Sequence, residues 1–263
     1  MRNLMNLQIF QIDAFTDNVF AGNPAAVCPL NEWLPDDQMQ KIALENNLSE
    51  TAFFVDTGDA FGLRWFTPAE EVDLCGHATL ATAYLLLTRL TPEKARVDFD
   101  TRSGRLSVTR DGDFLAMDFP AQPPRRMDTP QAIADALGGS PREFWAQRDF
   151  MAVYETEAEV RVLKPDMAGL MDIDGRGVIA TAPGEECDFV SRFFAPAVGI
   201  PEDPVTGSTH CVLVPYWSER LGKADLTARQ VSPRGGELFC RNEGNRVRIA
   251  GRAALYMVGE IFV

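Results

Sequence analysis

A cysteine and a histidine flank a single glycine in the segment Val72-Asp-Leu-Cys-Gly-His-Ala-Thr79. A thiol beside an imidazole suggests a nucleophile with its base, half of a metal site, or a helix start against which a ligand docks. Residues two apart do not face one another on a helix, and a nucleophile and its base usually come from different elements. The spacing of Cys75 and His77 is therefore poor for a catalytic dyad, and Cys75 is expected to be a small buried packing residue.

A glutamate stands where a helix is expected to end and a buried strand to begin. Glu50 is followed by Thr-Ala-Phe-Phe-Val55, a run typical of a strand. A carboxylate bordering such a run is partly desolvated, which raises its pKa from about 4.3 towards neutrality. Such a carboxyl group can take a proton and return it, so Glu50 is a candidate general acid/base. On position alone, a solvated loop glutamate is the alternative.

Three blocks of sequence recur in the same order in the two halves of the chain, which indicates two similar α/β units with a site between them. Each half has a strand-like run, an Arg-aromatic-Phe-x-Pro block, and a glycine turn into an apolar helix. The matched blocks are 51–55 with 178–182, 64–68 with 192–196, and Cys75-Gly-His-Ala-Thr79 with Thr206-Gly-Ser-Thr-His210. The position that matches Glu50 is Gly177 or Val178, so the second half has no equivalent carboxylate.

Both glycine turns open a helix whose first N–H groups lack internal partners and carry partial positive charge. Gly76 and Gly207 would let a ligand approach the backbone closely, and Ala78 supplies a further N–H group. Two such ends facing one cleft would hold a small anionic metabolite that bears a carboxylate. Well-capped buried helices are the alternative reading.

Zinc and thiol chemistry both need residues that the chain lacks at the right spacing. Cys75, His77, His210 and Cys211 are conceivable zinc ligands, but neither segment offers a second ligand at a familiar spacing. A thiol racemase needs two opposed cysteines, and the residue that matches Cys75 is Thr206. We therefore expect no metal, and a cysteine-dependent racemase is a less favoured alternative.

The composition is that of a soluble globular protein, with 46% hydrophobic and 24% charged residues among 263. The net charge of -13 argues against nucleic-acid binding, which needs clustered Lys and Arg. Five scattered cysteines with no C-x-x-C pair suggest reduced thiols. Because no signal peptide or membrane-spanning run is seen, we expect a cytoplasmic protein without membrane partners.

Short strands dominate the predicted secondary structure, and polar–apolar alternation, as in Arg246-Val-Arg-Ile249, predicts sheets with one solvated face. The second predicted helix is apolar almost all round and should be buried, and the last should kink near Pro215. The predicted helices are 35–45, 77–90, 130–137 and 208–221. A proline-rich linker at 120–129 divides residues 1–120, with Glu50, from 121–263, whose final strand is allowed to pack back on the first half.

Six motifs together resemble the PhzF-like family, the phenazine-biosynthesis isomerase and its relatives, from residue 12 to beyond 210. They are Asp13-Ala-Phe-Thr16, Gly22-Asn-Pro24, Asn47-Leu-Ser-Glu-Thr-Ala-Phe53, Arg64-Trp-Phe-Thr-Pro68, Cys75-Gly-His-Ala-Thr79 and Glu202-Asp-Pro-Val-Thr-Gly-Ser208. The resemblance implies a diaminopimelate-epimerase-like α/β (α+β) fold. In that fold each of two pseudo-symmetric halves wraps a sheet around a central helix, and the site lies in the cleft.

The resemblance also implies cofactor-free proton transfer, with no cofactor bound. It assigns the catalytic acid/base to Glu50 and places His77, Asp203 and Ser208 around the substrate. The family prototype acts on a dihydro-hydroxyanthranilate, and family precedent suggests a homodimer. A small-molecule binding protein that keeps the fold without turnover is the alternative from another functional class.

Overall fold

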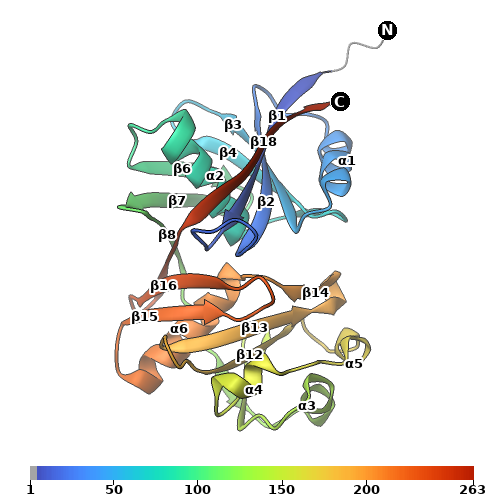
Figure 1. Ribbon diagram of the computed structural model, residues 1–263, viewed down its shortest axis with the longest axis vertical. Helices are drawn as coiled ribbons and strands as arrows, with labels where there is room; N and C mark the ends of the chain where they lie inside the picture. The colour runs from blue at the N-terminus through green and yellow to red at the C-terminus, as the bar shows by residue number, and fades with distance from the viewer. Residues whose placement is uncertain (1–4) are drawn as a thin grey trace. The chain divides into compact units, whose positions relative to one another are not determined.

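The computed structural model describes residues 5–263, which form two compact units (Figure 1). Unit 1 runs to Asp118 and resumes at Ala250–Val263, and unit 2 is Phe119–Ile249. Within the described residues, no helix is both long enough and apolar enough to pass through a membrane.

Unit 1 contains a mixed sheet to which both ends of the chain contribute. The C-terminal strand β18 (Ala253–Phe262) pairs antiparallel with the whole of β1 (Asn6–Ala14), and β1 also pairs with β2 (Asn23–Leu30) (Figure 1). The other strands of this unit are β3 (Glu50–Asp56), β4 (Phe61–Phe66), β5 (Glu71–Val72), β6 (Arg96–Thr101), β7 (Gly104–Asp111) and β8 (Phe114–Pro120). The last residues of the chain therefore belong to the same sheet as the first.

The buried helix of unit 1 is α2 (Gly76–Leu85), which continues into the π-helical turn η1 (Leu86–Leu90). All residues of α2 are buried except Gly76 and Tyr84, and the helix packs against β1, β2, β3 and β18. The prediction of a buried helix from the apolar segment is confirmed. The other helix of this unit, α1 (Asp36–Asn46), has one buried side, formed by Met39, Ile42 and Ala43.

Unit 2, like unit 1, consists mainly of strands. Its one long helix, α6 (Gly207–Leu221), contacts β15 and β16. Its strands are β9 (Arg125–Met127), β10 (Glu143–Ala146), β11 (Phe150–Val153), β12 (Val178–Pro183), β13 (Phe189–Ala195), β14 (Ile200–Asp203), β15 (Asp225–Gln230), β16 (Gly236–Asn242) and β17 (Arg246–Gly251). Its shorter helices are α3 (Gln131–Leu137), α4 (Glu157–Arg161), α5 (Met167–Met171) and the 3₁₀ turn η2 (Pro196–Val198).

Several local predictions for this unit were incomplete. The proline-rich linker contains β9, which pairs with β10, because a short edge strand tolerates neighbouring prolines. Helices α4 and α5 are one-turn elements that begin at the side-chain caps Thr156 and Asp166, and they are too short to give a periodic signal. Helix α6 runs without a break through Pro215.

The internal repeat is confirmed by the strand pairings of the two units, each taken by itself. In unit 1, β2 and β3 are parallel, β4 is antiparallel to β3 and β5, and β4 is parallel to β6. In unit 2, β11 and β12 are parallel, β13 is antiparallel to β12 and β14, and β13 is parallel to β15. In unit 1 helix α2 follows the short strand β5, and in unit 2 helix α6 follows the short strand β14.

The two arginine blocks make the same interaction in their own units. Arg64 donates two hydrogen bonds to Glu71, both at 2.7 Å, and its guanidinium lies 5.2 Å from the centre of the Phe66 ring. Arg192 donates to the Glu202 carboxylate at 2.7 and 2.9 Å and lies 4.8 Å from the Phe194 ring. A bidentate arginine stacked on an aromatic ring thus fixes the acidic loop that precedes each helix.

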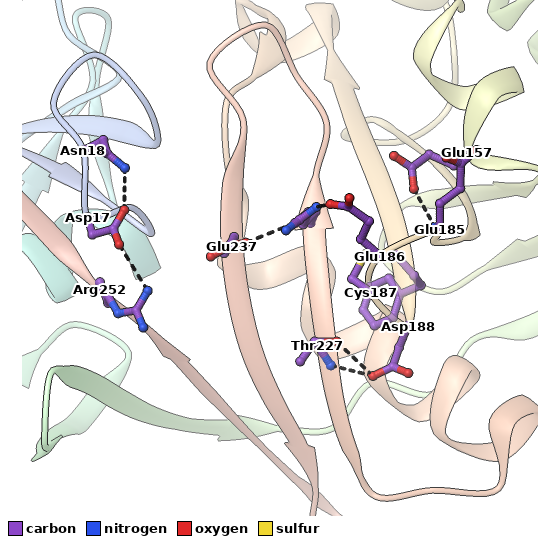
Figure 2. A network of polar contacts seen from close by, with 12 residues as sticks. Asp17, Asn18, Glu157, Glu185, Glu186, Cys187, Asp188, Thr227, Glu237 and Arg252 are labelled. Atoms are coloured by element: carbon purple, nitrogen blue, oxygen red, sulfur yellow. Dashed lines mark hydrogen bonds and ion pairs between the residues drawn. The ribbon is translucent and has the colours of Figure 1, made fainter.

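Acidic side chains also fix surface loops, as Figure 2 shows for the loop between β12 and β13. The Asp188 carboxylate accepts hydrogen bonds from the backbone N–H of Thr227 at 2.7 Å and from its hydroxyl at 3.1 Å. Glu157 accepts from the Glu185 backbone N–H at 2.9 Å. The same figure shows Asp17 of unit 1 bound by Asn18 and Arg252. These carboxylates therefore help to hold surface loops in place.

A tight turn between β1 and β2 explains the Gly-Asn-Pro motif. Gly22 has φ +64°, and a Cβ atom there would lie 2.2 Å from the Ala14 carbonyl oxygen and 2.7 Å from Thr16 Cγ2. Phe15 has φ 64° and is fully buried, and its N–H donates to the Arg252 carbonyl at 2.8 Å. The Ala14 carbonyl and the Thr16 side chain therefore lie so close to Gly22 that only glycine fits at this position.

We expect Gly22→Ala to destabilise the fold by more than about 3 kcal/mol, because it adds a clash with backbone to an unfavourable φ. The matched control is Gly112→Ala, where φ is +60° but no atom lies within 4 Å of the new Cβ. That variant should lose only about 1 kcal/mol. Urea unfolding measures both, and equal losses would contradict the role assigned to the close approach.

Candidate active site

Glu50 and His77 lie side by side in unit 1. Glu50 is the first residue of β3, and His77 is the second residue of α2, which packs on β3. His77 Nε2 lies 3.1 Å from Glu50 Oε2, and the two side chains are 6% and 12% exposed. The angles are not those of a hydrogen bond, so among the described residues neither atom has a hydrogen-bond partner. Two buried polar atoms in this state are suited to engage a ligand.

The other ring nitrogen of His77 has two neighbours. Asn23 Nδ2 lies 3.2 Å from His77 Nδ1, and Cys75 Sγ lies 3.5 Å from the same atom. The expectation that Cys75 and His77 do not meet was wrong. Cys75 is the N-cap of α2 with φ −142° and ψ 112°, so it is extended rather than helical and its side chain reaches the second residue of the helix.

The charges around this group determine its protonation. Burial and the Glu50 carboxylate raise the pKa of Cys75 to about 11, so the thiol is protonated at neutral pH and is no ready nucleophile. Burial lowers the pKa of His77, but the negative charges that Cys75 and Glu50 can carry outweigh it and hold this pKa well above 6.5. Because the thiol is neutral at pH 7, the Glu50 carboxylate is the neighbour whose charge raises the pKa of His77.

The positions of these side chains fit a proton path better than a metal site. Ligand atoms of Glu50, Cys75 and His77 lie within 4.8 Å of one another. Glu50, however, is next to Nε2 and Cys75 is next to Nδ1. A bound ion would also need the thiolate form of Cys75, which burial and the Glu50 carboxylate disfavour.

His210 and Cys211, the conceivable zinc ligands of unit 2, bond to their own helix. His210 Nδ1 donates to the Thr206 carbonyl at 2.8 Å, and Cys211 Sγ lies 3.9 Å from the Gly207 carbonyl. Burial lowers the pKa of His210 to about 4, so its ring is neutral at pH 7. Because the unfolded chain binds this proton more readily, His210 removes stability as the pH falls from 6.5 to about 4.

Asp203 belongs to a buried network that fixes the turn before α6. Its carboxylate accepts a hydrogen bond from the Thr206 hydroxyl. Gln230 accepts from the Thr206 N–H at 2.9 Å and donates to the Asp203 carbonyl at 2.7 Å. The sequence predicted Asp203 and the glycine turn but not Gln230, because a polar residue at the end of a strand carries no local signal of burial.

Ser208, the second residue of α6, has an unpredicted partner in Arg176. Arg176 donates to Ser208 Oγ at 3.1 Å and makes two hydrogen bonds to the buried Asp149 carboxylate at 2.9 and 2.6 Å. Because arginine only donates, the serine oxygen accepts and its own proton is left to donate elsewhere. Arg176 stands just before β12, so the second unit has a cation near the position where the first has Glu50. Gly207 and Ala78, also predicted, are buried in the first turns of α6 and α2.

The two histidines should titrate far apart. In a pH series of ¹H–¹⁵N spectra of the imidazoles, His210 should stay neutral to about pH 4, and His77 should hold its proton well above pH 6.5. Glu50→Gln removes the neighbouring charge and should lower the pKa of His77 while leaving His210 unchanged. An unmoved His77 signal in that variant would contradict the electrostatic coupling.

Comparisons with known proteins identify the family of the chain. The model of the phenazine biosynthesis-like family, PhzC-PhzF, matches residues 12–259. An uncharacterized isomerase of Pseudomonas aeruginosa is 53% identical over 257 residues, covering 98% of this chain and 99% of that protein. A crystal structure of a phenazine biosynthesis protein of the PhzF family from Enterococcus faecalis has a TM-score of 0.97 and 47% identity, covering 98% of this chain and all of the other.

The fold extends to more distant enzymes. A hydroxyproline epimerase from Agrobacterium vitis has a TM-score of 0.63 at 12% identity, with 98% of this chain and 93% of that chain covered. This likeness shows the fold alone, and it confirms the predicted epimerase-like α/β fold. The family match and the relative named as an isomerase support a general isomerase role.

Proposed function

The chain belongs to the phenazine biosynthesis-like family, and from this premise we propose that it is a cofactor-independent isomerase with Glu50 as the general acid/base. Its substrate would be a small carboxylate-bearing metabolite with an acidified C–H bond. The observation that carries the proposal is the buried Glu50–His77 pair, whose facing atoms Oε2 and Nε2 have no hydrogen-bond partner of good geometry among the described residues. Such atoms are ready to exchange a proton with a bound molecule.

The chemistry needs a group that takes a proton from carbon and returns it to another atom of the same molecule. The Glu50 carboxylate would remove the proton and deliver it again. The imidazole beside it would stabilise the carboxylate in one step and compensate for its loss of charge in the next. Burial of both groups keeps water from competing for the proton.

The remaining predicted residues have supporting roles in this proposal. Ser208 would donate a hydrogen bond to the substrate, since Arg176 occupies its oxygen as an acceptor. In unit 1 the N–H groups at Gly76 and Ala78 would bind the carboxylate, as helix N-termini do, and Gly207 stays a predicted binding residue. Asp203 stays a predicted orienting residue, and its hydrogen bond from Thr206 supports that role.

Glu50→Gln should abolish turnover, with kcat reduced at least a thousandfold, because the amide cannot carry the proton. The test is incubation in deuterated water with a dihydro-hydroxyanthranilate and with a metabolite extract, followed by NMR detection of deuterium bound to carbon. Glu71→Gln, which alters the Arg64 ion pair and not the site, is the matched carboxylate control. Exchange that persists in Glu50→Gln would overturn the assignment.

Cys75→Ala should keep at least a third of the exchange rate, because a thiol with a pKa of about 11 is protonated at neutral pH. The small cavity left by the missing sulfur should lower the free energy of unfolding by about 1 kcal/mol. The same exchange assay and a urea titration measure both effects. Complete loss of exchange in a folded variant would favour the cysteine-dependent racemase instead.

A binding protein without turnover makes a different prediction in this assay. The wild-type protein would then bind acids of the metabolite extract, which line broadening in their NMR spectra would show. No carbon atom would gain deuterium. The lack of a well-oriented hydrogen bond at Glu50 Oε2 and His77 Nε2 favours the enzyme, because a purely structural pair would be hydrogen-bonded within the fold.

A further inference from the structure

Asn23 lies against His77 at the ring nitrogen that does not face Glu50. Its Nδ2 atom is 3.2 Å from His77 Nδ1, while His77 Nε2 is 3.1 Å from Glu50 Oε2. Asn23 is fully buried and His77 is 5% exposed. The three side chains form one line of polar groups inside an otherwise apolar part of unit 1.

The fold leaves little freedom in the position of Asn23. It is the first residue of β2, and the parallel register places Ala25, two residues later, beside Glu50 of β3. The turn before it is fixed by Gly22, and helix α2 packs on both strands. The asparagine and the glutamate are therefore held by neighbouring strands, with the histidine presented to both by the helix.

The orientation of the imidazole decides which atom Glu50 meets. A half-turn about the Cβ–Cγ bond exchanges Nδ1 with Cδ2 and Nε2 with Cε1, so a ring turned the other way would present carbon to the carboxylate. A polar partner at Nδ1 selects the orientation in which Nε2 faces Glu50.

We propose that Asn23 is the positioning residue that holds Nε2 of His77 against Glu50. An amide suits this place because it can donate through Nδ2 to a neutral ring, or after its own half-turn accept through Oδ1 from an imidazolium. The ring can then gain and lose a proton and keep a partner in both states. The importance of Asn23 for turnover rests on the proposed function, whereas its effect on the orientation of the His77 ring does not.

The groups that titrate beside the ring are Glu50 from β3 and Cys75 from the cap of α2. Cys75 also approaches Nδ1, at 3.5 Å, but a thiol is only a weak donor. Asn23 is thus the stronger partner of Nδ1. A carboxylate in its place would accept only, and would favour the charged ring.

The test uses Asn23→Asp, which keeps the shape and removes the donor, and Asn23→Ala, which removes both donor and acceptor. Imidazole ¹⁵N shifts of the free protein report the His77 Nδ1 hydrogen bond, and His210 in the same spectra is the internal reference. We expect Asn23→Asp to move the His77 titration to higher pH and Asn23→Ala to shift the Nδ1 resonance. His210 should not move in either variant.

The matched control is Asn46→Asp, which makes the same chemical change next to β3, where Asn46 Nδ2 donates to Thr51 Oγ1 at 3.0 Å. It should leave the His77 Nδ1 resonance in place. With any acid that shows Glu50-dependent exchange, Asn23→Asp and Asn23→Ala should lower kcat at least tenfold and change KM less than twofold.

Unchanged His77 resonances and titration in folded Asn23→Asp and Asn23→Ala would overturn the proposal, as would an equal change in Asn46→Asp. If the wild-type protein exchanges no acid at all, the proposed function fails. The spectra of the free protein would still decide whether Asn23 orients the ring. If either variant does not fold, the other carries the comparison with Asn46→Asp.

Discussion

A carboxylate and an imidazole buried side by side are stable only if the surrounding fold replaces the water that they lose. In this protein Glu50 begins a strand, His77 begins a helix, and Asn23 begins the neighbouring strand. The three side chains meet because a largely apolar helix is buried against the strands that carry the other two. The position of the site thus follows from the hydrophobic burial of α2. The close turn at Gly22 further fixes the position of Asn23, the next residue.

The same supersecondary plan, used twice, carries different side chains at corresponding places. Both units fix the loop before the long helix with a bidentate arginine stacked on phenylalanine, and both open that helix with a glycine. Unit 1 has a carboxylate and an imidazole at the helix start, whereas unit 2 has a serine hydroxyl beside an arginine–aspartate pair. The repeated plan is structural, and the two units differ in the side chains that it presents at the start of the helix.

Cys75 shows how environment changes the meaning of a reactive residue type. A cysteine two residues from a histidine suggests nucleophilic chemistry, and the sulfur does lie 3.5 Å from the imidazole. Burial and the nearby carboxylate nevertheless keep the thiol protonated by raising its pKa to about 11. The catalytic potential of the cluster therefore rests on oxygen and nitrogen rather than on sulfur.

The sequence by itself determined the buried helix predicted over 77–90, the internal repeat, and the strand predicted over 51–55, directly after Glu50. Each of these depends on the order of apolar and turn-forming residues along the chain. Only the tertiary structure brought Cys75 and Asn23 to Nδ1 of His77, paired Arg176 with Ser208, and buried Gln230 against the turn before α6. These contacts join residues on different elements, or depend on a cap residue whose extended backbone no periodic pattern reveals. A side chain's partner across the fold is fixed by strand register and helix packing, and neither can be seen from one segment alone.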